Sequence, residues 1–318
     1  MSLLGIDLGG TKLATAVFSE GAELLGKESL PLEKRHGAAV GALLTAQVSK
    51  LVQQQQQLGD PVAAIGVCIP GISNRKEGTV CAPNIPGWEN YPLAAEIKAV
   101  APGIPVAIDS DRTCYIMGEA WKGAAQGCTD AIFIGVGTGI GAGILADGHF
   151  LRGHNDTAGA VGWMAMQKPW HPKYRQCGHF ETMASGDGIA KVARELLEAD
   201  PSYNGVLGKD NNGYPDAAAV FAAFQQEDPL AKQVISQCVE WWGMAVANLV
   251  SIFNPEKIIM GGGVFGPAIP LIPAIYEEAA KWAQPLSIQR VEVVPSQLGP
   301  VAGCWGAGLL ALQAKAAR

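Results

Sequence analysis

Hydrophobic and polar positions along this chain follow two patterns: short apolar runs typical of buried strands, and longer stretches with helical spacing. Leu3 to Asp7 and Lys12 to Phe18 are β-prone runs joined by Gly9-Gly10-Thr11, so the chain is predicted to open on a hairpin. Ala38 to Gln57 is apolar and Gln-rich at helical spacing, and Val62 to Ile69 is typical of a buried strand. This alternation predicts an α/β layer structure.

The same alternation returns in the middle of the chain. Val106 to Asp109 is predicted to be a strand followed by a helix, and two further strands, Ala131 to Gly135 and Gly143 to Leu145, flank a glycine-rich turn. A strand, a Gly-Thr turn and a strand thus occur at residues 3–18 and again at 131–145. Two lobes of similar topology would explain this repeat.

The last third of the chain is more helical. Apolar residues at helical spacing between residues 239 and 253 predict a helix in which Trp241 and Trp242 serve packing rather than ligand stacking. A strand is expected at Lys257 to Met260, and an Ala-rich helix from about Val301. Residues 153–178 show no clear period, so we expect a loop-rich segment that faces a ligand.

Length and composition narrow the function classes. A chain of 318 residues suggests two domains with a cleft between them, and 48% hydrophobic against 16% charged residues indicates a compact globular protein. The net charge of −6 argues against nucleic acid or an anionic membrane surface as the main partner, and favours a small-molecule ligand. No apolar run reaches the roughly 20 residues of a membrane span. The scattered cysteines suit reduced thiols, and the expected location is the cytoplasm.

The first chemical motif is the turn that opens the chain. A tight Gly9-Gly10-Thr11-Lys12 hairpin can expose backbone N–H groups and a hydroxyl to an anion, and Asp7 at the end of the incoming strand can hold a hydrated magnesium ion. An ordinary hairpin with a surface lysine is the alternative. The spacing of a Walker A loop is absent.

Two further glycine clusters follow. Gly137, Gly139 and Ala142 formally match a dinucleotide fingerprint, but that motif requires a helix where Ile144-Leu145 indicates a strand, so a second phosphate-contacting hairpin is the better interpretation. Gly261-Gly262-Gly263, after a buried strand, would allow close approach to a nucleobase and ribose. A plain strand-to-helix turn explains that cluster equally well.

Phosphoryl transfer to a hydroxyl needs a carboxylate as general base. Asp109 and Asp111 are the candidates, since they stand where a predicted strand ends and a helix begins. Either could instead be a helix cap. The residues themselves leave this choice open.

Taken in order, several motifs resemble the ROK family of sugar kinases and repressors, a branch of the actin, hexokinase and Hsp70 superfamily. The resemblance covers nearly the whole chain and rests on I-D-L-G-G-T-K at 6–12, C-I-P-G-I at 68–72, A-P-N-I-P-G-W at 82–88, D-R-T-C-Y-I-M-G-E at 111–119, G-V-G-T-G-I-G-A-G-I at 135–144, N-P-E-K-I-I-M-G-G-G-V at 254–264 and G-C-W-G-A-G at 303–308. It implies a two-lobed actin-like ATPase fold, related to ribonuclease H, with an interdomain cleft. We expect a small lobe of residues 1–111 completed by a C-terminal helix at about 301–318, and a large lobe of residues 112–300.

The resemblance also implies roles for individual residues. It selects Asp111 over Asp109 as the general base of an ATP- and magnesium-dependent sugar kinase. The implied phosphate and magnesium contacts are Asp7, Gly9, Gly10, Thr11 and Lys12, with Gly137, Thr138 and Gly139 opposite them and Gly261, Gly262 and Gly263 beside adenosine. The implied sugar contacts are Gly71, Asn84, Ser110, Asp111 and Glu181. A homodimer is expected, and a sugar-binding regulator without a DNA-binding domain, or a kinase that has lost its acceptor, are the alternatives.

Departures from the family pattern concern the acceptor and a metal. Ala160 and Trp163 stand where the family has a glutamate and a histidine, and Ser110 replaces an asparagine. Because each unpaired sugar hydroxyl would cost roughly 1–3 kcal/mol, we do not expect a standard hexopyranose held in the family's manner. Trp163 would offer a flat apolar wall to a sugar, amino sugar or polyol.

The family's structural zinc motif is eroded as well. Aligned on Glu181, its cysteine positions hold Pro172, Tyr174 and His179, so structural zinc is predicted to be absent. A different zinc site formed by Cys177, His171 and His154 matches no zinc spacing, and scattered loop histidines are the preferred interpretation.

Overall fold

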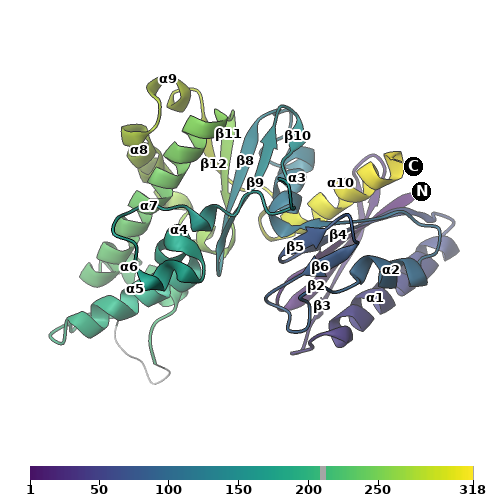
Figure 1. Cartoon of the computed structure of the whole chain (residues 1–318), viewed down its shortest axis with the longest axis horizontal. Helices are drawn as coiled ribbons and strands as arrows, with labels where there is room; N and C mark the ends of the chain where they lie inside the picture. The colour runs from purple at the N-terminus through teal and green to yellow at the C-terminus, as the bar shows by residue number, and fades with distance from the viewer. Residues whose placement is uncertain (208–212, 318) are drawn as a thin grey trace. The chain divides into compact units, whose positions relative to one another are not determined.

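The computed structural model describes residues 1–207 and 213–317, which fall into two compact units (Figure 1). The first unit comprises Met1–Gly127, Phe150–Ala158 and the C-terminal stretch from Gln297, and the second comprises Cys128–His149 and Gly159–Ser296. The first unit therefore extends past the boundary that we expected at residue 111. The reason is that α3 (Asp111–Lys122) packs along α10 (Ala302–Ala316).

A five-stranded sheet forms the centre of the first unit. Its order is β3-β2-β1-β4-β7, with bounds Leu24–Pro31, Lys12–Ser19, Ser2–Leu8, Val62–Ile69 and Val106–Ser110. β1 and β2 pair antiparallel, as the predicted opening hairpin requires, while β4 and β7 continue the sheet in parallel. The strands predicted from the apolar runs are confirmed to within a residue or two.

Alternating residues of this sheet face two different sets of helices. Leu4 and Ile6 pack with Val40 and Leu44 of α1 (Ala38–Gln57), whose bounds are those predicted. Leu3 faces the other way, toward α10. Gly66 of β4 lies so close to this helix that a Cβ there would overlap the Ala307 carbonyl oxygen. The small residues of α10 thus place it directly behind the strands.

Smaller elements complete the first unit. α2 (Leu93–Val100) follows a short hairpin of β5 (Ile72–Asn74) and β6 (Thr79–Cys81). The Ser73 hydroxyl donates to the Ile108 carbonyl oxygen at 3.0 Å, which fastens this hairpin to β7.

The second unit repeats the sheet topology of the first. Its order is β10-β9-β8-β11-β12, with bounds His149–Phe150, Ile140–Ala146, Ala131–Val136, Lys257–Gly261 and Glu292–Pro295. Again an antiparallel hairpin, β8-β9, is extended by parallel strands. The repeat seen in the sequence therefore corresponds to two similar sheets, and the strand that follows the glycine turn excludes a dinucleotide-binding helix there.

Helices cover the second sheet. They are α4 (Gly178–Ala184), α5 (Gly186–Ala199), α6 (Ala217–Gln225), α7 (Pro229–Phe253), α8 (Ile272–Trp282) and α9 (Pro285–Ile288). The indole N–H of Trp242, which is fully buried in α7, donates to the Ala184 carbonyl oxygen at 3.1 Å, so its predicted packing role is confirmed. Before α4 begins at Gly178, the segment from residue 153 contains only two short 3₁₀ turns, Val161–Trp163 and Pro172–Arg175, which confirms a loop-rich segment. Within the described residues, no helix is both long and apolar enough to cross a membrane.

Asp228 caps the longest of these helices and gives a stability prediction. One carboxylate oxygen accepts the N–H groups of Leu230 and Ala231, and the other accepts from Tyr203 and Val206. Burial alone would raise the Asp228 pKa, but these donors outweigh it and the pKa is lowered. Asp228→Asn turns one acceptor into a donor, so we expect the free energy of unfolding to fall by about 2 kcal/mol at pH 7.

The pH dependence of this loss of stability follows from the direction of the Asp228 pKa shift. A carboxylate whose pKa is depressed on folding contributes stability above its unfolded pKa of about 3.9, and loses that contribution as the pH falls through its folded pKa. Urea unfolding of both proteins from pH 7 to pH 3 should therefore show the difference shrinking with acidification. A difference that stayed constant would contradict the assignment.

Candidate functional site

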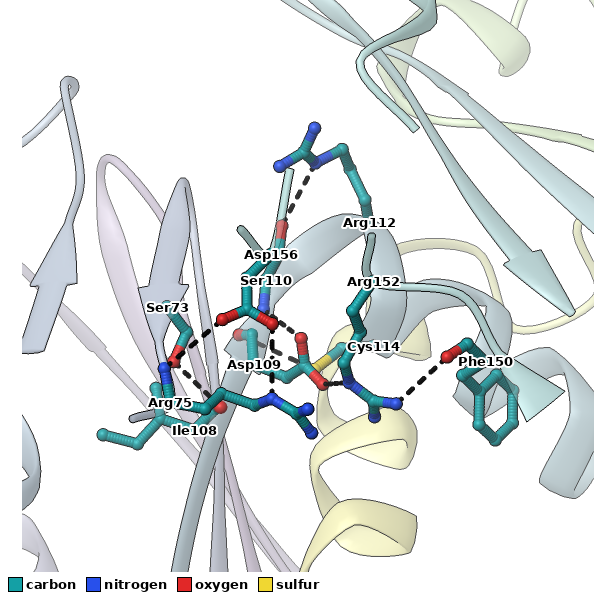
Figure 2. Close-up of polar contacts among 10 residues, drawn as sticks. All are labelled: Ser73, Arg75, Ile108, Asp109, Ser110, Arg112, Cys114, Phe150, Arg152 and Asp156. Atoms are coloured by element: carbon teal, nitrogen blue, oxygen red, sulfur yellow. Dashed lines mark hydrogen bonds and ion pairs between the residues drawn. The ribbon is translucent and has the colours of Figure 1, made fainter. Parts of the chain in front are cut away.

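The two candidate carboxylates lie in different environments, Asp109 within β7 and Asp111 at the start of α3. Figure 2 shows the contacts of Asp109. Asp109 is buried, and its Oδ2 forms an ion pair with Arg152 Nε at 2.7 Å. Its Oδ1 accepts the Ser110 backbone N–H at 2.9 Å. Both oxygens of Asp109 are therefore engaged in contacts within the chain.

Asp111 is the first residue of α3 and has no such pairing. Its Oδ1 accepts the Ser110 hydroxyl at 3.1 Å and the Arg112 backbone N–H at 2.8 Å. Among the residues that the structure describes, none forms an ion pair with this carboxylate. Burial raises the Asp111 pKa, and the nearby Arg112 charge offsets only part of that effect. Its Oδ2 accepts no hydrogen bond from the described residues.

Asp7, at the end of β1, lies within electrostatic range of Asp111. Burial raises the Asp7 pKa to about 6, a hydrogen bond from Cys68 opposes this, and the Asp111 charge adds to it. Gly303 of α10 packs directly on this carboxylate, and a Cβ at that position would overlap it. No ion pair to Asp7 occurs in the described part of the chain. The Lys12 charge lowers the Asp7 pKa only slightly against these effects. A sheltered carboxylate without an ion pair, near a second carboxylate, fits a hydrated divalent cation.

The turn after Asp7 is open to ligands. The Gly9 N–H donates to the Lys12 carbonyl oxygen at 2.9 Å and closes the hairpin. Gly10, Thr11 and Lys12 are exposed, and a Cβ at Gly10 would meet no atom within 4 Å. The opening hairpin thus presents polar groups beside the Asp7 carboxylate.

In the second unit, the glycine turn between β8 and β9 borders a pocket of about 390 Å³. The Gly186 N–H donates to the Gly137 carbonyl oxygen at 2.7 Å, which ties the turn to the start of α5. The lining residues are Gly137, Thr138, Gly186, Asp187, Ala190, Asp216, Ala217, Ala218, Phe221, Gly263, Val264 and Pro267. Three residues predicted to contact ATP, Gly137, Thr138 and Gly263, therefore share one pocket, and Gly139 completes their turn.

The other two glycines of the Gly261-Gly262-Gly263 cluster lie outside the pocket lining. Gly261 ends β11 against the Phe133 ring, and Gly262 has a φ of +88°, where a Cβ would overlap the Val136 carbonyl oxygen. Neither lines the pocket, whereas Gly263 does. Close packing of the backbone accounts for Gly261 and Gly262.

Of the residues expected to bind the sugar, Glu181 and Trp163 belong to the second unit. Glu181 Oε2 accepts the Ile140 N–H at 2.6 Å, so this carboxylate also fixes the start of β9. Trp163 ends a 3₁₀ turn and is 56% exposed, and Ala160 before it is exposed as well. The tryptophan ring is therefore accessible to a ligand.

Gly71 and Asn84 belong to the first unit, with Ser110. Gly71 has a φ of +150°, and a Cβ there would overlap the Cys81 carbonyl oxygen, so only glycine fits this position after β4. Asn84 is exposed in a loop supported by Trp88, whose ring stacks on Tyr91 at 4.4 Å. Ser110 is buried and holds Asp111.

The segment that resembles a zinc motif has an aromatic environment. His179 is buried, its ring lies 4.6 Å from that of Tyr174 and 4.8 Å from that of Trp241, and neither ring nitrogen has a hydrogen-bond partner in the described structure. Burial lowers the His179 pKa. Cys177 contacts the Thr182 hydroxyl at 3.2 Å. Among residues 1–207 and 213–317, no three His, Cys, Asp or Glu side chains gather where they could hold a metal ion, so the residues present do not fit structural zinc.

Several site residues escaped the sequence analysis. Arg152 pairs with Asp109 across 43 residues, and no local pattern indicates this. Asp187 and Asp216 line the second-unit pocket. Asp216 caps α6 through the Ala219 N–H at 2.8 Å, so an Asp directly before an Ala-rich run was the available signal for it.

Comparisons with known proteins agree with these observations. A family model described as ROK family matches residues 3–314. The chain is 32% identical to a glucokinase of Halalkalibacterium halodurans, over 98% of this chain and 94% of the relative. A ROK family glucokinase from Streptomyces griseus, solved in complex with glucose and AMPPNP, is 29% identical with a TM-score of 0.77, covering 98% of this chain and all of that one. A ROK family transcriptional regulator, a homologue of the E. coli MLC protein, is 27% identical with a TM-score of 0.84, covering 99% of this chain and 78% of that one.

Proposed function

This chain belongs to the ROK family, and from that membership together with the site geometry we propose that it transfers a phosphoryl group from ATP to a hydroxyl of a sugar or sugar-like substrate. The α/β, actin-like ATPase fold expected from the sequence is confirmed by the solved ROK kinases. The observation that carries the proposal is the contrast at the end of β7. Asp109 pairs with Arg152, whereas Asp111 forms no ion pair with any described residue and has a raised pKa.

In this proposal Asp111 accepts the proton of the attacking hydroxyl. Ser110 and the Arg112 N–H hold its Oδ1, so that Oδ2 has a fixed direction. Gly9, Gly10, Thr11 and Lys12 offer donors to the phosphates. Asp7 would hold magnesium through water, and bound magnesium would neutralise charge on the phosphates.

The second-unit pocket is the proposed nucleotide site. Gly137, Thr138 and Gly139 would donate to phosphate oxygens, and Gly263 leaves space for the adenosine. Gly71, Asn84, Trp163 and Glu181 are proposed as acceptor contacts. Glu181 would do so with the oxygen that Ile140 does not use.

The proposal is tested by a coupled ADP-release assay over a panel of sugars, sugar derivatives and polyols, with and without magnesium. We expect magnesium-dependent turnover of at least one acceptor above the ATPase background. ATP binding with no turnover on any acceptor would instead support a sugar-binding regulator, a candidate that similarity to the transcriptional regulator favours.

The nucleotide pocket gives a separate prediction. A Cβ at Gly263 would meet no atom within 4 Å, so Gly263→Val should fold normally while its side chain occupies ligand space. We expect AMPPNP affinity, measured by calorimetry, to fall by about tenfold or more, equivalent to about 1.4 kcal/mol. Gly266→Val, in the same segment but outside the pocket lining, is the matched control. Equal affinities for the two variants would place the nucleotide elsewhere.

A further inference from the structure

Three arginines from separate elements lie around the carboxyl end of β7, within the first unit, and the Arg112 guanidinium points away from those of Arg75 and Arg152 (Figure 2). Arg75 directly follows β5, Arg112 lies in the first turn of α3, and Arg152 belongs to the segment Phe150–Ala158. The proposed base, Asp111, adjoins this group. The positive charge of these arginines therefore acts on any ligand that binds at Asp111.

Two of the three arginines are balanced by carboxylates. Arg152 pairs with the buried Asp109, and its Nη1 also donates to the Phe150 carbonyl oxygen at 3.1 Å. Arg75 Nε lies 3.3 Å from Asp156 Oδ1, but the Arg75 side chain is 52% exposed. Arg152 is thus a structural residue, while Arg75 keeps its terminal amino groups accessible.

Arg112 is different because no carboxylate lies within ion-pair distance of it in the described part of the chain. Its Nε donates to the Ser110 hydroxyl at 3.2 Å. Its two terminal amino groups make no hydrogen bond to any described residue. The side chain is only half-buried, so these amino groups remain available. A guanidinium held at one nitrogen presents the other two in a fixed fork.

Helix stability does not explain a cation at this position. The first turn of a helix carries the positive end of the helix dipole, which favours anions and disfavours Arg. Arg112 therefore works against α3, and it does so one residue after the proposed base. Residues that are unfavourable for the local secondary structure occur mostly at functional sites.

We propose that the hydroxyl acceptor carries an anionic group, a carboxylate or a phosphate, which Arg112 binds in a bidentate manner. This inference rests on the proposed phosphoryl transfer at Asp111. Guanidinium groups bind carboxylate and phosphate through paired, charge-assisted hydrogen bonds, and the helix N-terminus adds to the attraction. A neutral polyol would leave the Arg112 fork without a matching partner.

A competing explanation is that Arg112 only stabilises the ionised form of Asp111. That role would act on every acceptor alike and would move the pH profile of kcat. The proposed role would instead appear in the binding of charged acceptors alone. The two roles are separated by comparing related acceptors with and without an anionic group.

The experiment uses matched pairs of compounds: gluconate with glucitol, glucuronate with glucose, and glucose 6-phosphate with glucose. For the full-length chain, binding is measured by calorimetry without nucleotide, and turnover is measured by ADP release. We expect the charged member of at least one pair to bind about tenfold or more tightly than its neutral partner. Whether that member is a sugar acid or a sugar phosphate identifies the anionic group.

The test variant is Arg112→Gln, which removes the charge and the guanidinium fork and keeps a shorter polar side chain. Arg290→Gln, at an exposed position in the second unit, is the matched control. Arg112→Gln should weaken binding of the charged member by about 10- to 100-fold, as expected for charge-assisted hydrogen bonds, and leave the neutral member unchanged. The control should match the wild type.

The outcomes separate this inference from the proposed function. Neutral acceptors bound and turned over as well as charged ones would overturn the inference and leave phosphoryl transfer standing. Equal losses on both members of a pair, with a shifted pH profile, would also overturn it. Anion binding that disappears in Arg112→Gln without ADP release on any compound would support the anion site and reject the transfer.

Discussion

Asp111→Asn is expected to reduce kcat by about 10²- to 10⁴-fold, the usual effect of removing a general base. The substitution leaves Oδ1 in place, so the Ser110 hydroxyl and the Arg112 N–H keep their acceptor. Because burial raises the Asp111 pKa, a neutral isostere should cost no folding stability. The variant should therefore bind ATP and melt like the wild type while failing in turnover.

The comparison needs an Asp→Asn change that is chemically equivalent and remote from the site. Asp147 is exposed in the turn between β9 and β10 with a φ of +49°, a conformation that asparagine adopts readily. Asp147→Asn should keep full activity in the ADP-release assay. If Asp111→Asn retained more than about a tenth of the wild-type kcat, the base would have to be another group.

The sequence could predict those features of the site that depend on residues close together in the chain. The opening hairpin, α1 and the glycine turns follow from apolar spacing and from residues adjacent in the chain, and these predictions were confirmed. The residues themselves left the choice between Asp109 and Asp111 open, and only the family resemblance selected Asp111. Arg152, which pairs with Asp109, is 43 residues away in the sequence. Local patterns cannot show which of two neighbouring carboxylates meets a distant cation.

The glycines illustrate the same limit. From sequence, Gly261, Gly262 and Gly263 form one cluster with one proposed role. In the structure, close packing on Phe133 and Val136 requires the first two, and only Gly263 borders the pocket. The glycine spacing predicted that the backbone comes close to another group at this point. Which residues pack there could be seen only in the three-dimensional structure.

The pairing of Asp109 with Arg152 yields the largest expected effect on stability. The side chain of Asp109 is 3% exposed and that of Arg152 is 17% exposed. Arg152→Met removes the cation at similar length and leaves a buried carboxylate uncompensated, which typically costs about 3–5 kcal/mol. We expect a drop in melting temperature on the order of 10 °C, measured by circular dichroism.

The double variant Asp109→Asn/Arg152→Met is the decisive control, because it also removes the Asp109 charge that Arg152→Met leaves unpaired. Replacing both partners should recover most of the lost stability, as it does for buried ion pairs in general. The amide oxygen introduced by Asp109→Asn can still accept the Ser110 N–H, so the end of β7 should keep its path to Asp111. If the pair serves only to hold this strand end, the double variant should also recover turnover. A double variant as unstable as Arg152→Met would show that the cost came from lost packing or from the Phe150 contact, and not from an unpaired Asp109 charge.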